Sequence, residues 1–421
     1  MSITYKSPAS FSNFACLGGD CEDTCCRNWE IKLDREHFNL LNNAMSKDPD
    51  ESSVFEQYIH LNEKSITSDH DYAFIRMGVN GYCAMLDDKG LCSVHAKHGV
   101  NVLGEVCTMF PRVISRCGDT IELSGALSCP EVVRNCIDEK SPLKISRFKP
   151  SDLPRKNYPI KRELSNLKDD FYSENFELVR KSFMQILANE TYDLETRLYV
   201  LANLADKISS FYHRGCKKPA EKNLTSTIES LSNDDLVSKL SGVIKDYDVG
   251  PISMVVVNSI LSIKLNQSSD ENISQIYEKI IAHYHASIED NVAEYLLEKM
   301  METQAQLDSE THEYIDKAVT RYMINCLYRE WFISMPDPFT YMQMLLVRST
   351  ILRTLIYLDV GREQDLNSRA LKQKIVFIMY NYARNIDQNL DFLKVVYNAL
   401  SEQTMINFDF SPAFIRINSK N

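Results

Sequence analysis

The hydrophobic pattern changes along the chain, from short alternating runs near the N-terminus to long helical stripes. Trp29–Leu33 alternates apolar and polar residues, which predicts a short β-strand. Asp34 follows as the predicted N-cap of a helix that carries Phe38, Leu41 and Met45 on one face. Short elements of both kinds are therefore expected in the first third of the chain.

Helical periodicity dominates after residue 164. The stripes are Val292, Tyr295, Leu296 and Met300; Ile315, Val319, Tyr322, Met323 and Cys326; and Leu390, Leu393, Tyr397 and Leu400. The most apolar stretch, Met342–Leu358, contains Arg348 and Arg353 and is short for a bilayer span, so it predicts a buried core helix. A break is expected at Pro336–Pro338.

Cysteine and glycine positions divide the chain. Ten of the twelve cysteines lie between Cys16 and Cys136, and nine of the thirteen glycines precede residue 126. Four prolines between residues 141 and 162 predict a linker or an extended strap. The expected fold class is mainly α, with a cysteine-rich metal or iron–sulfur domain with short strands at 1–140, a Pro-rich linker at 141–164 and an α-helical domain at 165–421.

Composition and charge narrow the class of protein. The 44% hydrophobic and 25% charged residues are typical of a soluble globular protein. The net charge of −11 argues against a nucleic-acid partner, which usually requires a basic surplus. The N-terminal residues lack a basic segment followed by an apolar one, so no secretory signal is expected. We therefore expect a cytoplasmic protein without a membrane partner, in which clustered thiols indicate metal or redox chemistry.

The cysteines form motif-like groups. The first is Cys16-x4-Cys21-x3-Cys25-Cys26, and Cys83-x8-Cys92 and Cys107 follow. Thiolates are soft ligands, and four of them complete either a tetrahedral zinc site or a four-iron cluster. The candidate metal ligands are Cys16, Cys21, Cys25, Cys26, Cys83, Cys92 and Cys107. Iron–sulfur and structural zinc both remain open from the residues alone, and Cys25, Cys26, Cys83, Cys92 and Cys107 rank first.

The other cysteines have simpler interpretations. Cys117 and Cys136 are expected to be small hydrophobic residues, and Cys129 is intermediate. Cys216 in a predicted loop and Cys326 on an apolar stripe are not expected to bind metal. His95 and His98 follow Cys92, so a mixed site is conceivable, but solvated loop histidines are the expectation.

Five motifs resemble one family in order, spacing and flanking residues. They are Phe14-Ala-Cys-Leu-Gly-Gly-Asp-Cys-Glu-Asp-Thr-Cys-Cys-Arg-Asn-Trp29, Cys83-Ala-Met-Leu86, Leu91-Cys-Ser-Val-His95, Cys107-Thr-Met-Phe-Pro-Arg112 and Leu127-Ser-Cys-Pro-Glu131. This pattern resembles the FliB family of flagellin lysine N-methylases. The cysteine framework is also similar to that of the smaller YkgJ-like zinc- or iron-chelating proteins. The motifs cover the first 135 residues or so, and the resemblance continues less distinctively through the helical remainder.

The resemblance implies an activity and its cofactors. It implies a cytoplasmic methyltransferase that moves methyl groups from S-adenosylmethionine to lysine ε-amines of flagellin, its protein partner. It also implies a metal centre, taken to be a [4Fe-4S] cluster. The alternative is a non-catalytic zinc or iron–sulfur protein whose helical domain binds a protein partner.

The residues do not assign the catalytic groups or the binding site of the methyl donor. No glycine-rich turn stands between a predicted strand and a predicted helix, so a Rossmann-like methyltransferase is not expected. The radical motif Cys-x3-Cys-x2-Cys is incomplete, because Asn28 occupies the third position after Cys21 and Cys25. Arg112 is either a carboxylate or cluster contact or an ordinary structural arginine, and Trp29 is either a wall of the metal centre or a core residue.

Overall fold

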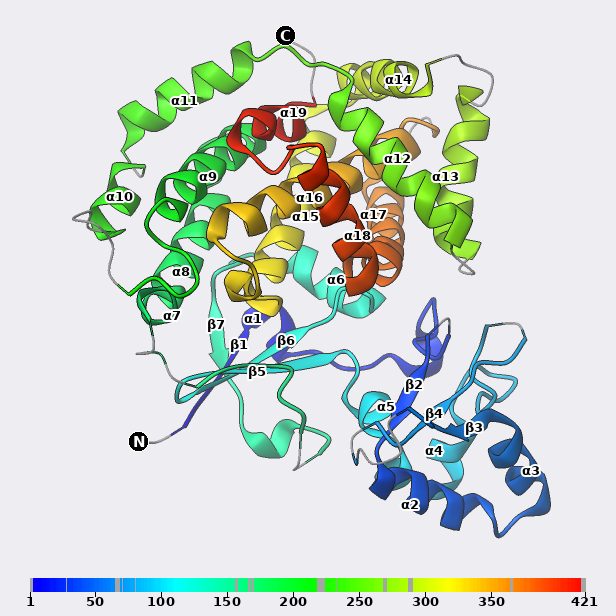
Figure 1. Cartoon of the computed structure of the whole chain (residues 1–421). Helices are drawn as coiled ribbons and strands as arrows, with labels where there is room; N and C mark the ends of the chain where they lie inside the picture. Colours follow the sequence, from blue (N-terminus) through cyan, green and yellow to red (C-terminus); the bar gives the residue numbers. More distant parts are fainter. Residues whose placement is uncertain are drawn as a thin grey trace.

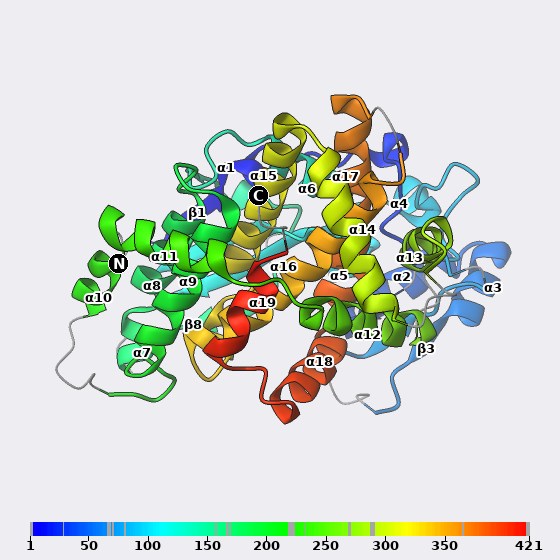
Figure 2. The ribbon, with the colours of Figure 1, turned by 90° about the horizontal axis from the view of Figure 1, so that it is seen from above.

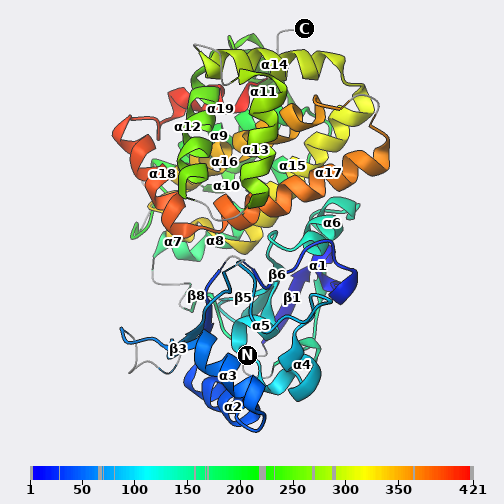
Figure 3. The same ribbon diagram turned by 90° about the vertical axis from the view of Figure 1, so that its right-hand side faces the viewer.

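The computed structural model describes residues 3–417 except 28, 65–68, 70, 80, 156–157, 166, 168–169, 218–223, 232, 268–270, 287–290 and 364–365. Three parts are stacked in Figure 3. A helical domain lies above a β-sheet, and a small module with its own short strands lies beyond the sheet, as Figure 1 also shows. The fold class is mainly α with a short-strand N-terminal region, as predicted.

The small module has its own hydrophobic core. Its strands are β2 (Ile31–Leu33), β4 (Ala73–Ile75) and β3 (Ile59–Leu61), antiparallel in that order. Its helices are α2 (Arg35–Met45), α3 (Pro49–Tyr58), α4 (Ser93–His98) and α5 (Glu105–Met109). The predicted strand and cap are confirmed: β2 lies in Trp29–Leu33, and the Asp34 carboxylate accepts the His37 backbone N–H at 2.9 Å. The core of the module is built from buried residues between Ile31 and Val94.

A second sheet connects this module to the helices. Its order is β7 (Ile145–Arg147), β1 (Thr4–Pro8), β6 (Thr120–Gly125), β5 (Arg112–Cys117) and β8 (Arg162–Leu164). Strands β1 and β6 are parallel, as are β5 and β8, and the other pairs are antiparallel. The segment 141–164 is thus an extended strap whose two strands form the edges of the sheet. Buried residues of β5, β6 and α6 (Pro130–Asp138) belong to the core of the helical domain, so residues 1–140 pack as two parts.

The helical domain surrounds one central helix. Its helices are α7 (Phe171–Glu174), α8 (Phe176–Leu187), α9 (Leu194–Ser209), α10 (Leu224–Ser230), α11 (Asp234–Asp246), α12 (Ile252–Gln267), α13 (Glu271–His283), α14 (Val292–Gln306), α15 (Ser309–Arg329), α16 (Pro338–Val360), α17 (Ser368–Tyr382), α18 (Leu390–Glu402) and α19 (Ser411–Ile415), and α1 (Ala9–Ser12) lies by the sheet. Short 3₁₀ turns occur at Gly18–Asp20, Val100–Val102, Pro150–Asp152, Phe332–Ser334 and Phe408–Phe410, and Ala383–Asp387 is a π-helix.

Every residue of α16 is buried, which confirms the predicted core helix. Figure 2 shows α16 in the middle of the helical domain. Pro338 occupies the first turn of α16, directly after the predicted break. None of the helices in the described ranges is long and apolar enough to cross a membrane.

A buried ion pair joins the sheet to the helical domain. Glu122 on β6 accepts two hydrogen bonds from the Arg180 guanidinium on α8, at 2.6 and 2.8 Å. Both side chains are almost fully buried, and Lys6 on β1 lies 3.0 Å from the same carboxylate. Burial raises the pKa of Glu122, but Arg180 and Lys6 outweigh burial and hold the pKa below its ordinary value. The carboxylate therefore stays charged at neutral pH.

Replacing Glu122 by glutamine should lower the free energy of unfolding by about 2 kcal/mol at neutral pH, because Arg180 loses its buried counter-charge. A carboxyl whose pKa is lowered by folding contributes stability above its unfolded pKa of about 4.3. This contribution is lost as the pH falls through the folded-state pKa, so wild type and variant should converge in acid. Urea unfolding at neutral and acidic pH measures the difference. The more exposed pair Glu163–Arg116 supplies the control Glu163→Gln, and equal losses in the two variants would contradict the expectation.

Candidate functional site

The segment that carries Cys25 and Cys26 lies beside Cys83. The Cys83 backbone N–H donates to the Cys26 carbonyl at 2.8 Å, and Arg27 and Tyr82 form an antiparallel bridge. The indole Nε1 of Trp29 donates to the Cys25 carbonyl at 2.7 Å. Backbone pairing therefore brings the first cysteine motif to the second across more than fifty residues of chain.

A tight turn brings Cys92 toward Cys83. Leu86 and Cys92 form an antiparallel bridge, and the Asp87 carboxylate accepts the backbone N–H groups of Lys89 and Leu91, each at 2.9 Å. Cys92 is the N-cap residue of α4. Burial raises the pKa of Cys92, whereas backbone N–H groups at the start of α4 lower it. The turn thus places two thiols at one end of a short helix.

Four thiols form an electrostatically coupled set, namely Cys25, Cys83, Cys92 and Cys107. Burial raises the pKa of Cys107, and the charges of Cys83, Cys92 and Cys25 raise it further. The neighbouring Cys26 thiol raises the pKa of Cys25, and burial adds to this. Cys25 and Cys107 are exposed to solvent, Cys92 is partly buried and Cys83 is buried. We call this set the four-thiol group. Deprotonating all four without a cation is unfavourable because the thiolates repel one another.

Three predicted ligands lie outside this group. Cys26 lies next to Cys25 and contacts its thiol. The charge of Cys16 acts on Cys21, and the charges of Cys21 and Cys25 both act on Cys129, the N-cap residue of α6. Burial raises the pKa of Cys129 to about 12. Salt bridges fix this loop: Glu22 pairs with Arg134 of α6 at 2.9 Å, and Asp23 pairs with Arg384 at 2.9 Å. Cys129 ranked only as intermediate from its sequence context, although its place before the proline of a predicted helix start is a recognisable signal.

The remaining cysteines and histidines lie elsewhere. Cys117, Cys136, Cys216 and Cys326 are buried in the core of the helical domain and sheet. The loop expected for His95 and His98 was wrong, because both residues belong to α4, where the Cys92 turn starts a helix. His98 Nε2 lies 2.8 Å from Glu51 rather than on a thiol. Asn28 falls outside the described residues.

A cleft of about 870 Å³ opens between the cysteine-rich loop, the sheet and the helical domain. Cys25 lies on its wall, so the four-thiol group borders the cleft. Trp29 and Phe110 also line it, with ring centroids 5.9 Å apart, and the Trp29 side chain is 36% exposed. Trp29 is therefore a wall of the cleft and not a core residue. A cavity of this size is typical of ligand sites.

The helical-domain wall of the cleft is a buried network of charges. Asp387, at the end of the π-helix, accepts hydrogen bonds from Arg329 at 2.9 Å and from Arg348. Glu330 also binds both arginines, and Tyr322 donates to Asp387 at 2.6 Å. Burial raises the pKa of Glu330, but Arg348 and Arg329 lower it to about 2. Two arginines therefore pair with two carboxylates in this wall of the cleft.

The same network contains a group of potential metal ligands. Potential ligand atoms of Cys326, Glu330 and Asp387 lie within 4.8 Å of one another. The carboxylates of Glu330 and Asp387 are already paired with Arg329 and Arg348. Their negative charge is therefore balanced without a metal cation.

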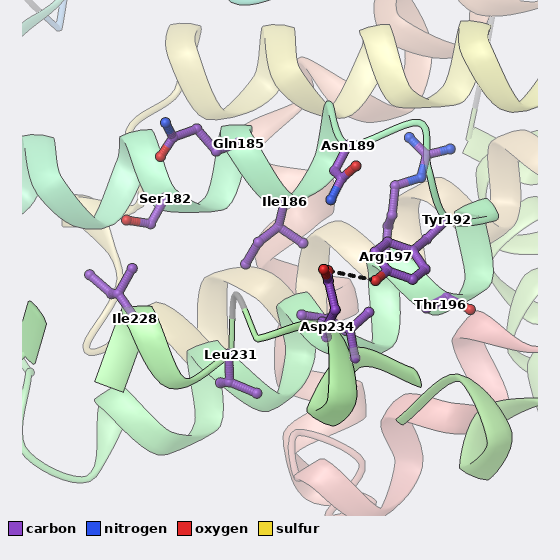
Figure 4. A pocket seen from close by; sticks show the side chains of 12 residues that line it. Ser182, Gln185, Ile186, Asn189, Tyr192, Thr196, Arg197, Ile228, Leu231 and Asp234 are labelled. Carbon is purple, nitrogen blue, oxygen red and sulfur yellow. Dashed lines mark hydrogen bonds between the residues drawn. The ribbon is translucent and has the colours of Figure 1, made fainter. Parts of the chain in front are cut away.

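A second cavity of about 290 Å³ lies among α8, α9, α10 and α11 (Figure 4). Tyr192 donates to Asp234 across it at 2.9 Å, and the Arg197 guanidinium is used internally by the Leu187 carbonyl and the Thr320 hydroxyl. Its lining contains no cysteine. The larger cleft is therefore the better candidate for chemistry that involves the thiols.

Comparison with known proteins identifies the family of the chain. The family described as FliB lysine N-methylase C-terminal domain matches residues 180–410, more than half of the chain. The chain is 29% identical over 144 residues to a lysine-N-methylase of Salmonella typhimurium, which covers 34% of this chain and 35% of that protein. It is 29% identical over 147 residues to the flagellar biosynthetic protein FliU of Salmonella muenchen, which covers 35% of this chain and 85% of that protein.

The aligned part thus spans about a third of the length of the lysine-N-methylase. No solved structure matches the chain. The family match alone covers most of the helical domain that forms one wall of the cleft. The chain belongs to the FliB lysine N-methylase family.

Proposed function

We propose that this protein is a protein-lysine N-methyltransferase that moves methyl groups from S-adenosylmethionine to lysine ε-amines of flagellin. The observation that carries the proposal is the cleft, which borders the four-thiol group and is walled by the FliB-type helical domain. The printed names of the relatives, a lysine-N-methylase and a flagellar biosynthetic protein, support the lysine acceptor and the flagellar substrate. The proposed site of reaction is in the cytoplasm, before flagellin is exported.

We also propose that the four-thiol group holds a [4Fe-4S] cluster. The donor set fits, because four thiolates complete such a cluster. Four thiolates also suit a tetrahedral zinc site, and the iron and sulfide content of the purified protein distinguishes the two. When bound, a cluster would cross-link three chain segments and supply a redox-active, negatively charged group beside the cleft.

The aromatic wall suits a lysine side chain. Trp29 and Phe110 offer ring faces to the methylene chain and to the ammonium group. Glu30 also lines the cleft, and its carboxylate has no ion pair within the described ranges, so it can attract the incoming cation. The pKa of Glu330 is too low for this residue to accept the lysine proton at neutral pH. We therefore assign Glu330 a structural role, in which it pairs with Arg329 and Arg348 in the wall of the cleft.

The chemical step is a displacement at the methyl carbon. The ε-ammonium first loses a proton to water in the open cleft, because only the neutral amine has a lone pair. Nitrogen then bonds to the methyl carbon as the carbon–sulfur bond breaks, and the electron pair of that bond remains on sulfur. The products are a methylated lysine and S-adenosylhomocysteine, whose sulfur is an uncharged thioether.

Incubating the anaerobically purified protein with monomeric flagellin and methyl-labelled S-adenosylmethionine should add whole methyl groups to lysines, as measured by mass spectrometry of peptides. Trp29→Ala should lower kcat/KM about tenfold through loss of cation–π contact, and Trp29→Phe should keep most activity. The absence of any methyl gain from metal-replete protein that binds the methyl donor would contradict the proposal. It would favour a metal protein that only binds a partner.

A further inference from the structure

Arg162 is a cation of the cleft wall that the charge of Glu330 reaches but that no carboxylate pairs with directly in the described ranges. It lies on β8, opposite Ser115 of β5, and the Lys161 backbone N–H donates to the Ile114 carbonyl at 2.8 Å. These contacts fix the backbone next to the guanidinium. Within the described ranges, no hydrogen bond or ion pair of the Arg162 side chain is present, although the residue is half-buried. Its position is therefore set by the sheet and not by a counter-charge.

Other arginines around the cleft already have acidic partners. Arg384 pairs with Asp23 at 2.9 Å, and Arg329 pairs with both Glu330 and Asp387. Arg112 likewise has no hydrogen-bond partner in the described part of the chain, but it faces the Phe14 ring and lies near the thiols of Cys16 and Cys129. Arg112 thus faces an aromatic ring and thiols, whereas Arg162 lies near Arg329 and Glu330 and forms no hydrogen bond in the described part of the chain.

Nearby polar atoms are also unsatisfied donors. Gln388 Nε2 and Arg329 Nε are buried without a partner in the described structure. Both residues line the same cleft, and the Gln388 carbonyl oxygen is already used by the Ser128 hydroxyl at 3.0 Å. Buried donors without acceptors cost free energy, so this wall favours a ligand that carries an acceptor.

We infer that Arg162, assisted by Gln388 and Arg329, anchors the carboxylate of the methyl donor. The inference rests on the proposed function, because S-adenosylmethionine carries one carboxylate. A planar guanidinium matches a carboxylate with two parallel hydrogen bonds. The acceptor lysine is a cation that Arg162 repels, so this charge separates the two substrates within one cleft.

The electrostatics of Arg162 agree with this assignment. Burial lowers the pKa of Arg162, the positive charge of Arg329 lowers it further, and Glu330 offsets part of the effect. A bound carboxylate would restore the missing counter-charge. Arg116, on the adjacent strand, lies 3.6 Å from Glu163 and donates to the Gly118 carbonyl, so it serves as a matched control.

The inference is tested by isothermal titration calorimetry, which measures the affinity of the metal-replete full-length protein for two nucleosides. S-adenosylhomocysteine has the carboxylate, whereas 5′-methylthioadenosine keeps the adenosine and thioether but lacks the amino-acid group. Wild type should bind S-adenosylhomocysteine about 10- to 100-fold more tightly than 5′-methylthioadenosine. Arg162→Ala should abolish this preference without changing the affinity for 5′-methylthioadenosine, Arg162→Lys should restore part of it, and Arg116→Ala should keep all of it.

The outcomes separate the inference from the proposed function. A preference that survives in Arg162→Ala, or equal binding of both nucleosides by wild type, overturns the carboxylate anchor and leaves methyl transfer standing. A wild-type protein that binds neither nucleoside overturns both. Circular dichroism and metal content of each variant confirm that unfolding does not cause the loss.

Discussion

Replacing Cys83 by serine should remove the metal and abolish methyl transfer. Cys83 is buried, and the charges of Cys92 and Cys25 reach it, so it is central to the four-thiol group. A serine hydroxyl is a hard, neutral donor that does not replace a thiolate on iron or zinc. Bound iron and acid-labile sulfide should fall at least tenfold, and the broad absorption near ~400 nm should disappear.

Two serine variants serve as controls. Cys216→Ser changes a buried cysteine of the helical domain, and Cys16→Ser changes a cysteine outside the four-thiol group. Both should retain iron and sulfide. Undiminished metal in Cys83→Ser would refute the assigned ligands. A colourless wild-type protein that contains zinc alone would refute the cluster and leave the four-thiol group as a zinc site.

Replacing Asp387 by alanine should lower the free energy of unfolding by about 3–5 kcal/mol. Asp387 is completely buried and binds Arg329, Arg348 and Tyr322, so its loss leaves two buried guanidiniums with one carboxylate, that of Glu330. Urea unfolding of the metal-replete protein measures the change. The side chains of Arg329 and Arg348 should become more mobile in the same variant, because each loses its ion pair with Asp387.

Asp391 provides the matched control for this prediction. It lies four residues after Asp387 in the first turn of α18, also lines the cleft, and pairs with Lys394 at 3.3 Å while almost fully exposed. Asp391→Ala should change the free energy of unfolding by less than about 0.5 kcal/mol. Similar losses in the two variants would show that the buried network contributes little to stability.

Local elements of this protein could be predicted from single residues. Asp34 caps α2 because its carboxylate competes well for the free N–H groups of a first helical turn. Pro338 opens α16 because a first-turn proline needs no N–H partner. The stripe from Ile315 to Cys326 lies on α15 and is buried, as a helical period predicts. Each of these signals acts over fewer than a dozen residues.

The candidate site depended on contacts that no local pattern contains. Asp387 and Arg348 are far apart in sequence, and their pairing follows from the packing of α16 beside the π-helix. The strap at 141–164 forms strands because the two edges of the sheet offered unpaired backbone groups, which proline content alone does not reveal. Arg162 reaches the cleft through that edge pairing.

The sequence by itself determined that the first third of the chain holds a dense set of thiols and that a helical domain follows. Only the tertiary structure brought Cys25, Cys83, Cys92 and Cys107 together and placed Cys25 on the wall of a cleft. The physical reason is the separation along the chain over which each property arises. Ligand type and helical period are properties of neighbouring residues, whereas the burial and mutual repulsion of Cys25, Cys83 and Cys107 arise when distant segments pack together.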